Sequence, residues 1–198
     1  MKACRVFFLL LLVLAAASAT CSILFPQFRK TEGPEGNTKK TVYFWYQQLS
    51  FPSPNAPDSI IVRIYSQNLP CSQARLYFTI MAALSVSGAA FLGISVLFAA
   101  CWINARNASC LSVVSTFLTI CACVCYGATL GLVVYTCRLT LCGDDTLGRL
   151  ALQADGYSFA EGFYLLCVAT GSAFISAITG LVLCCIAVCR GKDSDKDF

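Results

Sequence analysis

The residues with the greatest capacity for chemistry in this 198-residue sequence are its 14 cysteines. Cys121, Cys123 and Cys125 alternate along the chain, so on a helix they spread around the surface instead of converging on a metal ion. Asp144 and Asp145 are adjacent, a pattern more typical of a solvated turn than of a metal site. The sequence has no histidine, the commonest general base and metal ligand. We therefore expect no catalytic centre, no metal site, no cofactor and no enzymatic activity.

Three cysteines lie at or near the ends of polar segments, where a disulfide could form: Cys71, Cys137 and Cys142. Cys137 and Cys142 could close a small loop, or either of them could pair with Cys71. Three cysteines can form only one disulfide among themselves, so one thiol stays unpaired. The sequence does not decide which two residues pair.

A second group of cysteines lies beside basic residues near the chain ends. Cys184, Cys185 and Cys189 precede Arg190 and Lys192, and Cys4 is the matching residue near the amino terminus. Juxtamembrane cysteines of this kind are candidates for reversible palmitoylation, and inert burial is the alternative.

Four long apolar runs without ionisable side chains must position these residues. The chain is 58% hydrophobic and only 12% charged, whereas soluble domains carry ~25% charged residues. A bilayer core needs ~20 apolar residues per helix. We therefore predict one domain over residues 1–198, an all-α membrane protein with a four-helix transmembrane bundle, its spans covering residues 6–25, 76–102, 110–137 and 162–189.

The first span has an alternative reading as a signal peptide. Lys2 and Arg5 form a basic start, and Ala17-Ser18-Ala19 resembles a cleavage site. The apolar character continues through Phe25, however, which is long enough to span a bilayer. A mature protein beginning at Thr20 would contradict the four-span prediction.

The basic residues after the last span favour an orientation with both termini in the cytoplasm. This places loops 26–75 and 138–161 outside, and the turn 103–109 and the tail 190–198 inside. The sequon at Asn107 then lies inside, where we expect it to carry no glycan.

The first outer loop is expected to form a small extracellular β-sheet. Residues 41–51 and 59–66 are rich in aromatic and β-branched residues and predict a sheet of two or three strands. The stretch 28–40 contains Gly, Pro and Asn and is expected to resist regular structure. Trp45 is expected to be a packing residue in the small core of this sheet, and a position at the membrane interface is the alternative.

Small residues at helical spacing predict how the spans pack, because the hydrophobic effect does not drive helices together in lipid. The predicted packing residues are Ser85, Ala89 and Gly93 in the second span, Gly127 and Gly131 in the third, and Ser172, Ser176 and Gly180 in the fourth. Glu161 lies at the outer edge of the fourth span, where it is expected to favour the helix start. A pore built from one copy is not expected, because the spans lack charged residues.

The tetraspan layout and two sequence runs resemble the amastins, surface proteins of kinetoplastid parasites. The runs are CSQARLYFTIMAALSVSGAAF from Cys71 and GYSFAEGFYLLCVA from Gly156. The amastin signature, two cysteines around an aromatic, glycine and basic core, would fall on residues 41–51. Phe44, Trp45 and Gln48 fit it, whereas neither cysteine nor the glycine is present. The resemblance therefore implies a divergent member without the loop disulfide of the family.

The resemblance implies a parasite plasma-membrane protein that acts at the host–parasite interface. Its implied partners are the lipid bilayer and other membrane proteins or further copies of itself, with an unknown ligand and no nucleic acid. The first alternative is a claudin-like adhesion or barrier protein, which shares the expected architecture but has a paired tryptophan and two loop cysteines. The second is an oligomeric channel or small-solute transporter, which would need Glu161 or a polar helix face to line its path.

Overall fold

A computed structural model describes residues 2–32, 38–51, 60–69, 71–104, 109–142 and 151–194; residues 2, 104, 109 and 187–194 are described in backbone only. It contains four long helices: α1 (Lys2–Leu24), α2 (Ser72–Asn104), α3 (Ser109–Arg138) and α4 (Glu161–Ser194). Each is long and apolar enough to cross a membrane. Asn107, Asp144 and Asp145 lie outside the described residues, as do the side chains of Cys189, Arg190 and Lys192.

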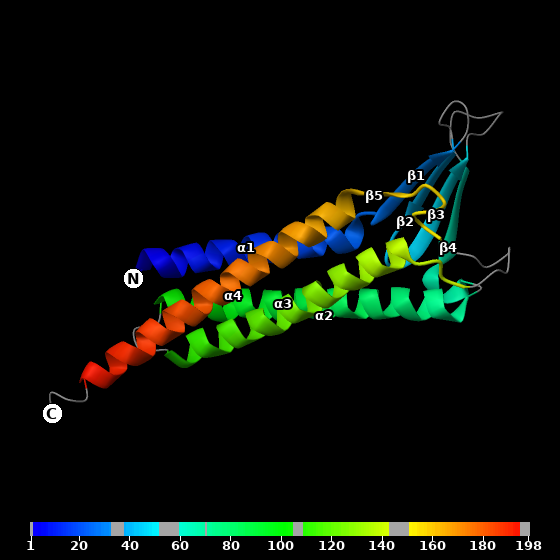
Figure 1. Ribbon diagram of the computed structural model, residues 1–198. Coiled ribbons are helices and arrows are strands. Elements are labelled where there is room, and N and C mark those ends of the chain that lie inside the picture. Colours follow the sequence, from blue (N-terminus) through cyan, green and yellow to red (C-terminus); the bar gives the residue numbers. More distant parts are fainter. Residues whose placement is uncertain are drawn as a thin grey trace.

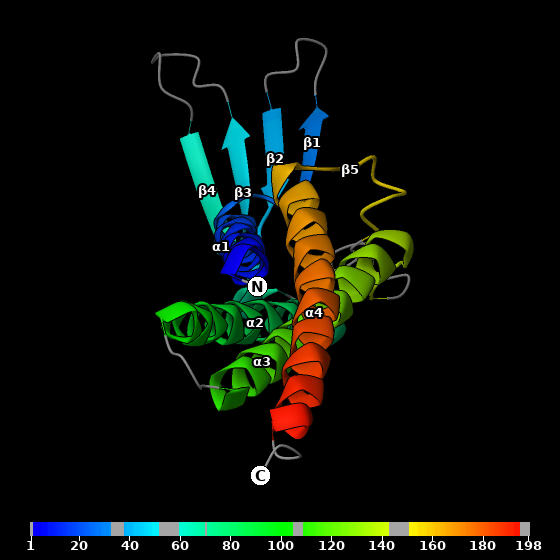
Figure 2. The ribbon, with the colours of Figure 1, turned by 90° about the vertical axis from the view of Figure 1, so that its left-hand side faces the viewer.

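The helices form a bundle in which each helix contacts the next one along the chain, and α4 closes the ring against α1 (Figures 1 and 2). Both chain termini lie at one end of the bundle, and a β-sheet lies at the other (Figure 1). The predicted fold class is therefore confirmed: a four-helix bundle suited to a membrane, with a small sheet, in the manner of claudins.

Helix α1 is part of the packed bundle. Phe8, Leu12, Ala15 and Ala19 on one face are all fully buried. Phe8 packs edge-on against Trp102 of α2, with ring centroids 6.4 Å apart. A cut after Ala19 would remove these residues and expose the faces of α2 and α4 that they cover, so the packing favours a retained first helix.

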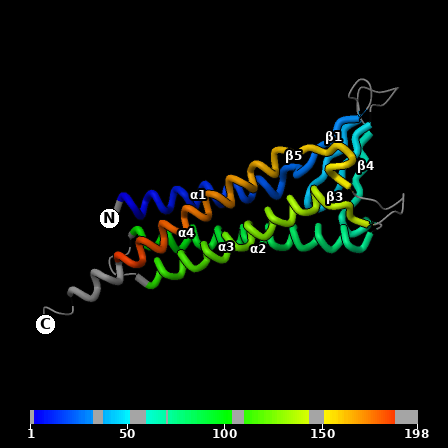
Figure 3. The backbone as a smooth tube through the Cα atoms, viewed as in Figure 1, coloured from blue at the N-terminus to red at the C-terminus, as the bar shows by residue number. Residues whose placement is uncertain are grey.

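The sheet has five antiparallel strands in the order β4-β3-β2-β1-β5. The strands are β1 (Phe28–Glu32), β2 (Thr38–Val42), β3 (Tyr46–Phe51), β4 (Ile60–Tyr65) and β5 (Ser158–Phe159). The first four are consecutive in the chain, and β5 comes from the segment before α4, beside β1 (Figure 3).

The prediction of two or three strands is wrong, for two physical reasons. First, residues 41–51 are not one strand, because the Tyr43 N–H donates to the Tyr46 carbonyl at 2.9 Å and turns the chain from β2 into β3. Second, part of the stretch expected to be irregular forms β1 and the start of β2. There Glu32 of β1 pairs with Lys30 on the same strand and with Lys40 across the sheet on β2, and the second pair gives the charged strands a favourable cross-strand contact.

The predicted packing role of Gly127 and Gly131 is also wrong within the chain. Both are exposed, and a Cβ added at either would meet nothing within 4 Å. The buried face of α3 instead follows Ser112, Ser115, Thr119, Ala122, Tyr126, Thr129, Val133 and Thr136, at steps of three and four residues. The two glycines lie off this stripe and so do not touch a neighbouring helix.

Gly93 in α2 is likewise exposed with open space at its Cβ position. The close approach on this helix is at Gly88, where an added Cβ would lie 2.8 Å from the Tyr126 ring. The Tyr126 hydroxyl donates to the Ser85 carbonyl at 3.1 Å, so this buried tyrosine joins α3 to α2. Ser85 is buried, and Ala89 is half-buried beside it.

On α4 the predicted small residues do face the bundle. Ser172, Ser176 and Gly180 are buried. A Cβ added at Gly180 would lie 2.6 Å from Thr116 Oγ1 on α3 and 3.2 Å from the Phe8 ring on α1. Gly180 is therefore the point where three helices approach most closely around a missing side chain.

Candidate interaction surface at the sheet end

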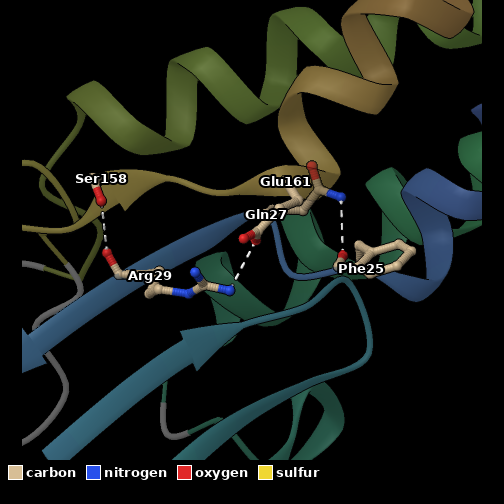
Figure 4. Close-up of polar contacts among 5 residues, drawn as sticks. All are labelled: Phe25, Gln27, Arg29, Ser158 and Glu161. Atoms are coloured by element: carbon tan, nitrogen blue, oxygen red, sulfur yellow. Dashed lines mark hydrogen bonds and ion pairs between the residues drawn. The ribbon is translucent and has the colours of Figure 1, made fainter.

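The sheet is attached to the bundle through a polar junction centred on Gln27. Its side chain is buried, and its Nε2 donates to the Ser22 carbonyl at 2.7 Å. The same Nε2 also donates toward the Phe25 carbonyl at 3.5 Å (Figure 4). These bonds cap the carbonyl end of α1. The Gln27 main chain also donates to the Val42 carbonyl of β2 and accepts from the Ala160 N–H, so one residue joins α1, the sheet and the start of α4.

Arg29 and Glu161 form an ion pair across this junction. Arg29 Nη2 donates to Glu161 Oε2 at 2.9 Å, and the Ser158 hydroxyl donates to the Arg29 carbonyl at 3.1 Å (Figure 4). Both charged side chains are about half exposed, so the pair adds little stability by itself. Glu161 lies in the first turn of α4, where its charge favours the helix start.

Gly162 permits the start of α4 to lie close against the backbone of Phe25 and Pro26, which follow α1. A Cβ at this position would lie 2.6 Å from the Phe25 carbonyl oxygen and 2.7 Å from the Pro26 carbonyl oxygen, and these backbone atoms cannot rotate away. Its N–H donates to the Pro26 carbonyl at 2.9 Å. Glycine is therefore required where α4 begins against the end of α1.

A disulfide fixes the opposite side of the sheet end. Cys71, just before α2, is bonded to Cys142, just after α3, with Cα atoms 5.9 Å apart. Cys137 is buried and free. The bond ties α2 to α3 near the place where the segment before α4 returns to the sheet, as the Gln153 N–H donates to the Cys137 carbonyl.

The residues that fit the family signature lie at the turn between β2 and β3 and on β3 itself. Phe44 is buried at 1% exposure in the core beneath the sheet, whereas Trp45 is 42% exposed. The prediction of Trp45 as a packing residue is therefore wrong, because its neighbour Phe44 occupies the core. Gln48 of β3 is half-buried and is paired with Thr41 in register.

Tyrosine rings and one arginine cover the sheet near β4. Tyr43 and Tyr46 stack with ring centroids 4.5 Å apart, and Tyr65 meets Tyr46 edge-on. The Arg63 guanidinium lies 5.3 Å from the Tyr46 ring centroid. Burial, then the neighbouring Tyr43, raises the pKa of Tyr46, so this phenol stays uncharged near neutral pH.

Charged groups gather at the β1–β2 end of the sheet. Hydrogen bonds from Lys30 and then from Lys40 lower the pKa of Glu32 to about 2. Lys30 also lies 5.7 Å from the Tyr157 ring, and burial raises the pKa of that phenol. The sheet thus has a charged end near the β1–β2 strands and an apolar, aromatic end at β3–β4.

The buried polar side chains of the described helices are the hydroxyl groups of serine and threonine. Ser95 contacts Ser115 at 2.9 Å and Thr119 at 2.8 Å, which joins α2 to α3. Among the side chains that the structure describes, none of the fully buried polar groups is charged. The same described part of the chain contains no group of three His, Cys, Asp or Glu residues able to hold a metal ion.

The predicted palmitoylation sites have different surroundings. Cys4 is exposed and lines an apolar pocket of about 490 Å³ between α1 and α4, with Phe7, Ile178 and Val182. Cys185 is exposed, whereas Cys184 faces α3, with its Sγ 3.2 Å from the Ser112 hydroxyl.

Several of these residues are missing from the sequence prediction although signals for them exist. Tyr126 is a tyrosine in the middle of an apolar span, and a buried hydroxyl requires a partner. Gln27 is the first polar side chain after the first span, close to the helix end that it caps. The long-range pairing of β1 with β5 has no comparable signal.

Comparison with protein-family models gives a match to a family described as amastin surface glycoprotein, over residues 7–183. Comparison with curated proteins gives no match. The family match covers all four helices in large part, the whole sheet and both segments that enter it.

Proposed function

Because the chain belongs to the amastin surface glycoprotein family, we propose that it is a non-enzymatic plasma-membrane protein of a kinetoplastid parasite that presents its β-sheet at the host–parasite interface. The observation that carries this proposal is the family match together with the position of the sheet at one end of a membrane-suited bundle. The sheet, with the Cys71–Cys142 disulfide near it, lies at the end of the bundle, where it is available for contacts outside lipid.

We propose that the sheet faces outward and that both termini are cytoplasmic. The Cys71–Cys142 disulfide lies at the sheet end, and disulfides persist in oxidising surroundings outside the cell. Helix α4 runs from the sheet junction to the opposite end of the bundle, so the backbone of Arg190 and Lys192 near its end lies there, as expected for a cytoplasmic face. Disulfide chemistry and charge therefore support the same orientation.

Antibody labelling on intact cells tests this placement. An antibody raised against the folded sheet domain should label unpermeabilised cells, whereas a tag appended after Phe198 should be detected only after permeabilisation. Labelling of the tag alone on intact cells would contradict the proposed orientation, and labelling of neither would contradict surface placement.

The contacts of Glu161 do not favour the transporter alternative. Its carboxylate pairs with Arg29 at the sheet junction instead of facing the interior of the bundle. The buried polar groups of the described helices are hydroxyls that bond to one another and to backbone carbonyls. Solute flux in proteoliposomes that is abolished by Glu161→Gln would revive this alternative.

We further propose acylation at the cytoplasmic end, on cysteines whose thiols are free to react. Cys4 and Cys185 are exposed, whereas Cys184 is turned toward Ser112 of α3. Acyl exchange should therefore label the native protein less after Cys4→Ser or Cys185→Ser and equally after Cys184→Ser. Loss of the label with Cys184→Ser alone would contradict this assignment.

A further inference from the structure

Strand β4 forms an open edge of the sheet. It pairs with β3 on one side, and among the described residues no strand pairs with its other side. All six of its side chains are exposed, with Ile60, Ile61, Val62, Ile64 and Tyr65 between 38% and 56%. Natural edge strands usually carry charges, proline or a bulge that prevent pairing with another chain. Within this strand only Arg63 is charged, so the edge has little protection.

The hydrogen-bonding groups of this edge can be assigned from the ladder. The Ser66 N–H donates to the Trp45 carbonyl at 2.8 Å, in line with the β3–β4 register. Directly opposed residues alternate between hydrogen-bonded and non-hydrogen-bonded pairs in an antiparallel ladder. Hence Ile60, Val62 and Ile64 bond to β3. The main-chain groups of Ile61, Arg63 and Tyr65 point outward.

The open edge of β4 faces sideways from the bundle axis, which is the direction in which a second copy in the same membrane would lie. Figure 2 looks along the bundle and shows the strands side by side, with β4 outermost. The sheet therefore spreads across the bundle axis, and its edge faces sideways. Two copies in one bilayer are related by an axis along the membrane normal, which here runs through the sheet face. Such an axis pairs two identical edge strands antiparallel.

We propose that β4 pairs with β4 of a second copy in the same membrane and joins the two sheets into one. Opposed residues must lie on the same face, and the two registers that meet this condition with the longest overlap of β4 are centred on Val62 and on Arg63. Centring on Arg63 would place two guanidinium groups opposite each other, which is unfavourable. In the register centred on Val62, Arg63 of each copy lies opposite Ile61 of the other copy. Each of these opposed pairs exchanges main-chain hydrogen bonds.

The chemistry of the strand supports a second copy as the occupant. In this register the two Val62 side chains meet, and each Ile60 lies opposite Ile64, so apolar side chains pair across the new contact. The bilayer holds both copies upright at one height, which reduces the orientational freedom lost on association. This pairing rests on the proposed membrane placement of the sheet.

Disulfide cross-linking of the full chain in liposomes tests the register. The two Val62 residues form a non-hydrogen-bonded pair with Cα atoms ~4.5 Å apart, within the range that a disulfide bridges. Val62→Cys should therefore give a dimer on mild oxidation. Lys39→Cys, exposed on the inner strand β2, should stay monomeric, as should the unmodified chain. Absence of the Val62 cross-link, or a stronger one with Arg63→Cys, would overturn the proposal.

A proline substitution tests the hydrogen bonds of the edge. The Arg63 N–H points away from β3. Arg63→Pro therefore removes one outward-pointing donor and keeps all the hydrogen bonds between β3 and β4. On the Val62→Cys background it should lower the dimer yield roughly tenfold, whereas Arg63→Ala, which keeps the N–H, should leave it unchanged. Equal yields from the two variants, each with unaltered thermal stability, would overturn the pairing.

The two proposals fail in distinguishable ways. If surface labelling of intact cells succeeds and the Val62 cross-link is absent, the self-pairing is wrong and the membrane placement stands. If in cells the Val62→Cys chain cross-links to a different protein and remains monomeric in liposomes, the edge binds another strand and the self-pairing is overturned.

Discussion

Replacing Gly180 by alanine should weaken the bundle, whereas the same change at Gly131 should not. At Gly180 the added Cβ would lie 2.6 Å from Thr116 Oγ1, 3.0 Å from Thr116 Cγ2 and 3.2 Å from Phe8 Cε2. Thr116 is a short β-branched side chain with few rotamers and is itself buried, so it cannot yield without a shift of helix α3. At Gly131 the added Cβ meets nothing within 4 Å.

The magnitude follows from overpacking. Extra methyl or methylene groups in a filled core typically cost about 1–3 kcal/mol, and the better helix propensity of alanine recovers up to ~1 kcal/mol. Because both alanine variants share this propensity gain, we expect the free energy of unfolding of Gly180→Ala to lie about 1–3 kcal/mol below that of Gly131→Ala. Gly131→Ala has only the propensity gain and should be neutral or slightly stabilising.

Thermal unfolding of the purified chain in one detergent measures both variants. A loss of 1 kcal/mol corresponds to a fall in Tm of roughly 2–4 °C for a chain of this size. Equal Tm values for Gly180→Ala and Gly131→Ala would refute the inferred three-helix contact. Measurement at high dilution removes any contribution of contacts between copies.

Three further expectations concern the sheet end. Gly162→Ala should lower Tm by more than Gly180→Ala, because its Cβ would meet backbone oxygen atoms that cannot rotate away; an equal or smaller loss would contradict this. Cys71→Ser, Cys142→Ser and the double variant should lower Tm by the same amount, since each removes one disulfide; additive losses would show separate roles. The pKa of Glu32 falls from 4.5 to about 2, so its ion pairs stabilise the folded sheet above pH ~4.5 and lose this effect as the pH falls toward 2. Glu32→Gln should flatten the dependence of Tm on pH in that window, and an unchanged dependence would argue against these ion pairs.

The helices could be predicted from the sequence because lipid imposes one strong requirement. Long runs without ionisable side chains have few alternatives to a membrane-suited helix. The helices still exceed the predicted spans, as α2 begins at Ser72 and α4 begins at Glu161. The charge-free runs mark only the part of each helix that lipid can surround. The helix itself continues beyond that part as long as its backbone hydrogen bonds are satisfied.

Helix packing was only partly predictable, because spacing identifies a smooth face but not what lies against it. The Gly127 and Gly131 pair matches a known motif and is exposed, whereas the unremarked Gly88 receives the Tyr126 ring. The difference depends on which side of α3 faces α2, a property of the whole bundle. Burial of Ser172 and Ser176 agrees with the sequence pattern because α4 is covered by α1 and α3 along that face.

The junction at the sheet end was the least predictable part. Arg29 and Glu161 are 132 positions apart, and their contact depends on the pairing of β5 with β1. Neither the two-residue strand β5 nor the close approach at Gly162 leaves a periodic signal. The break at Tyr43 depends on a single main-chain hydrogen bond, which an uninterrupted run of aromatic residues conceals.

The joining of β5 to β1 has a consequence for antibody recognition of the sheet end. Surface around Arg29 and Ser158 is assembled from two segments far apart in the chain, and the Cys71–Cys142 bond adds a second such link. A synthetic peptide copied from either segment would lack half of each composite epitope. Antibodies that recognise the native protein should therefore be conformational, and an immunogen would need the intact sheet end, with its disulfide formed and held by the helices.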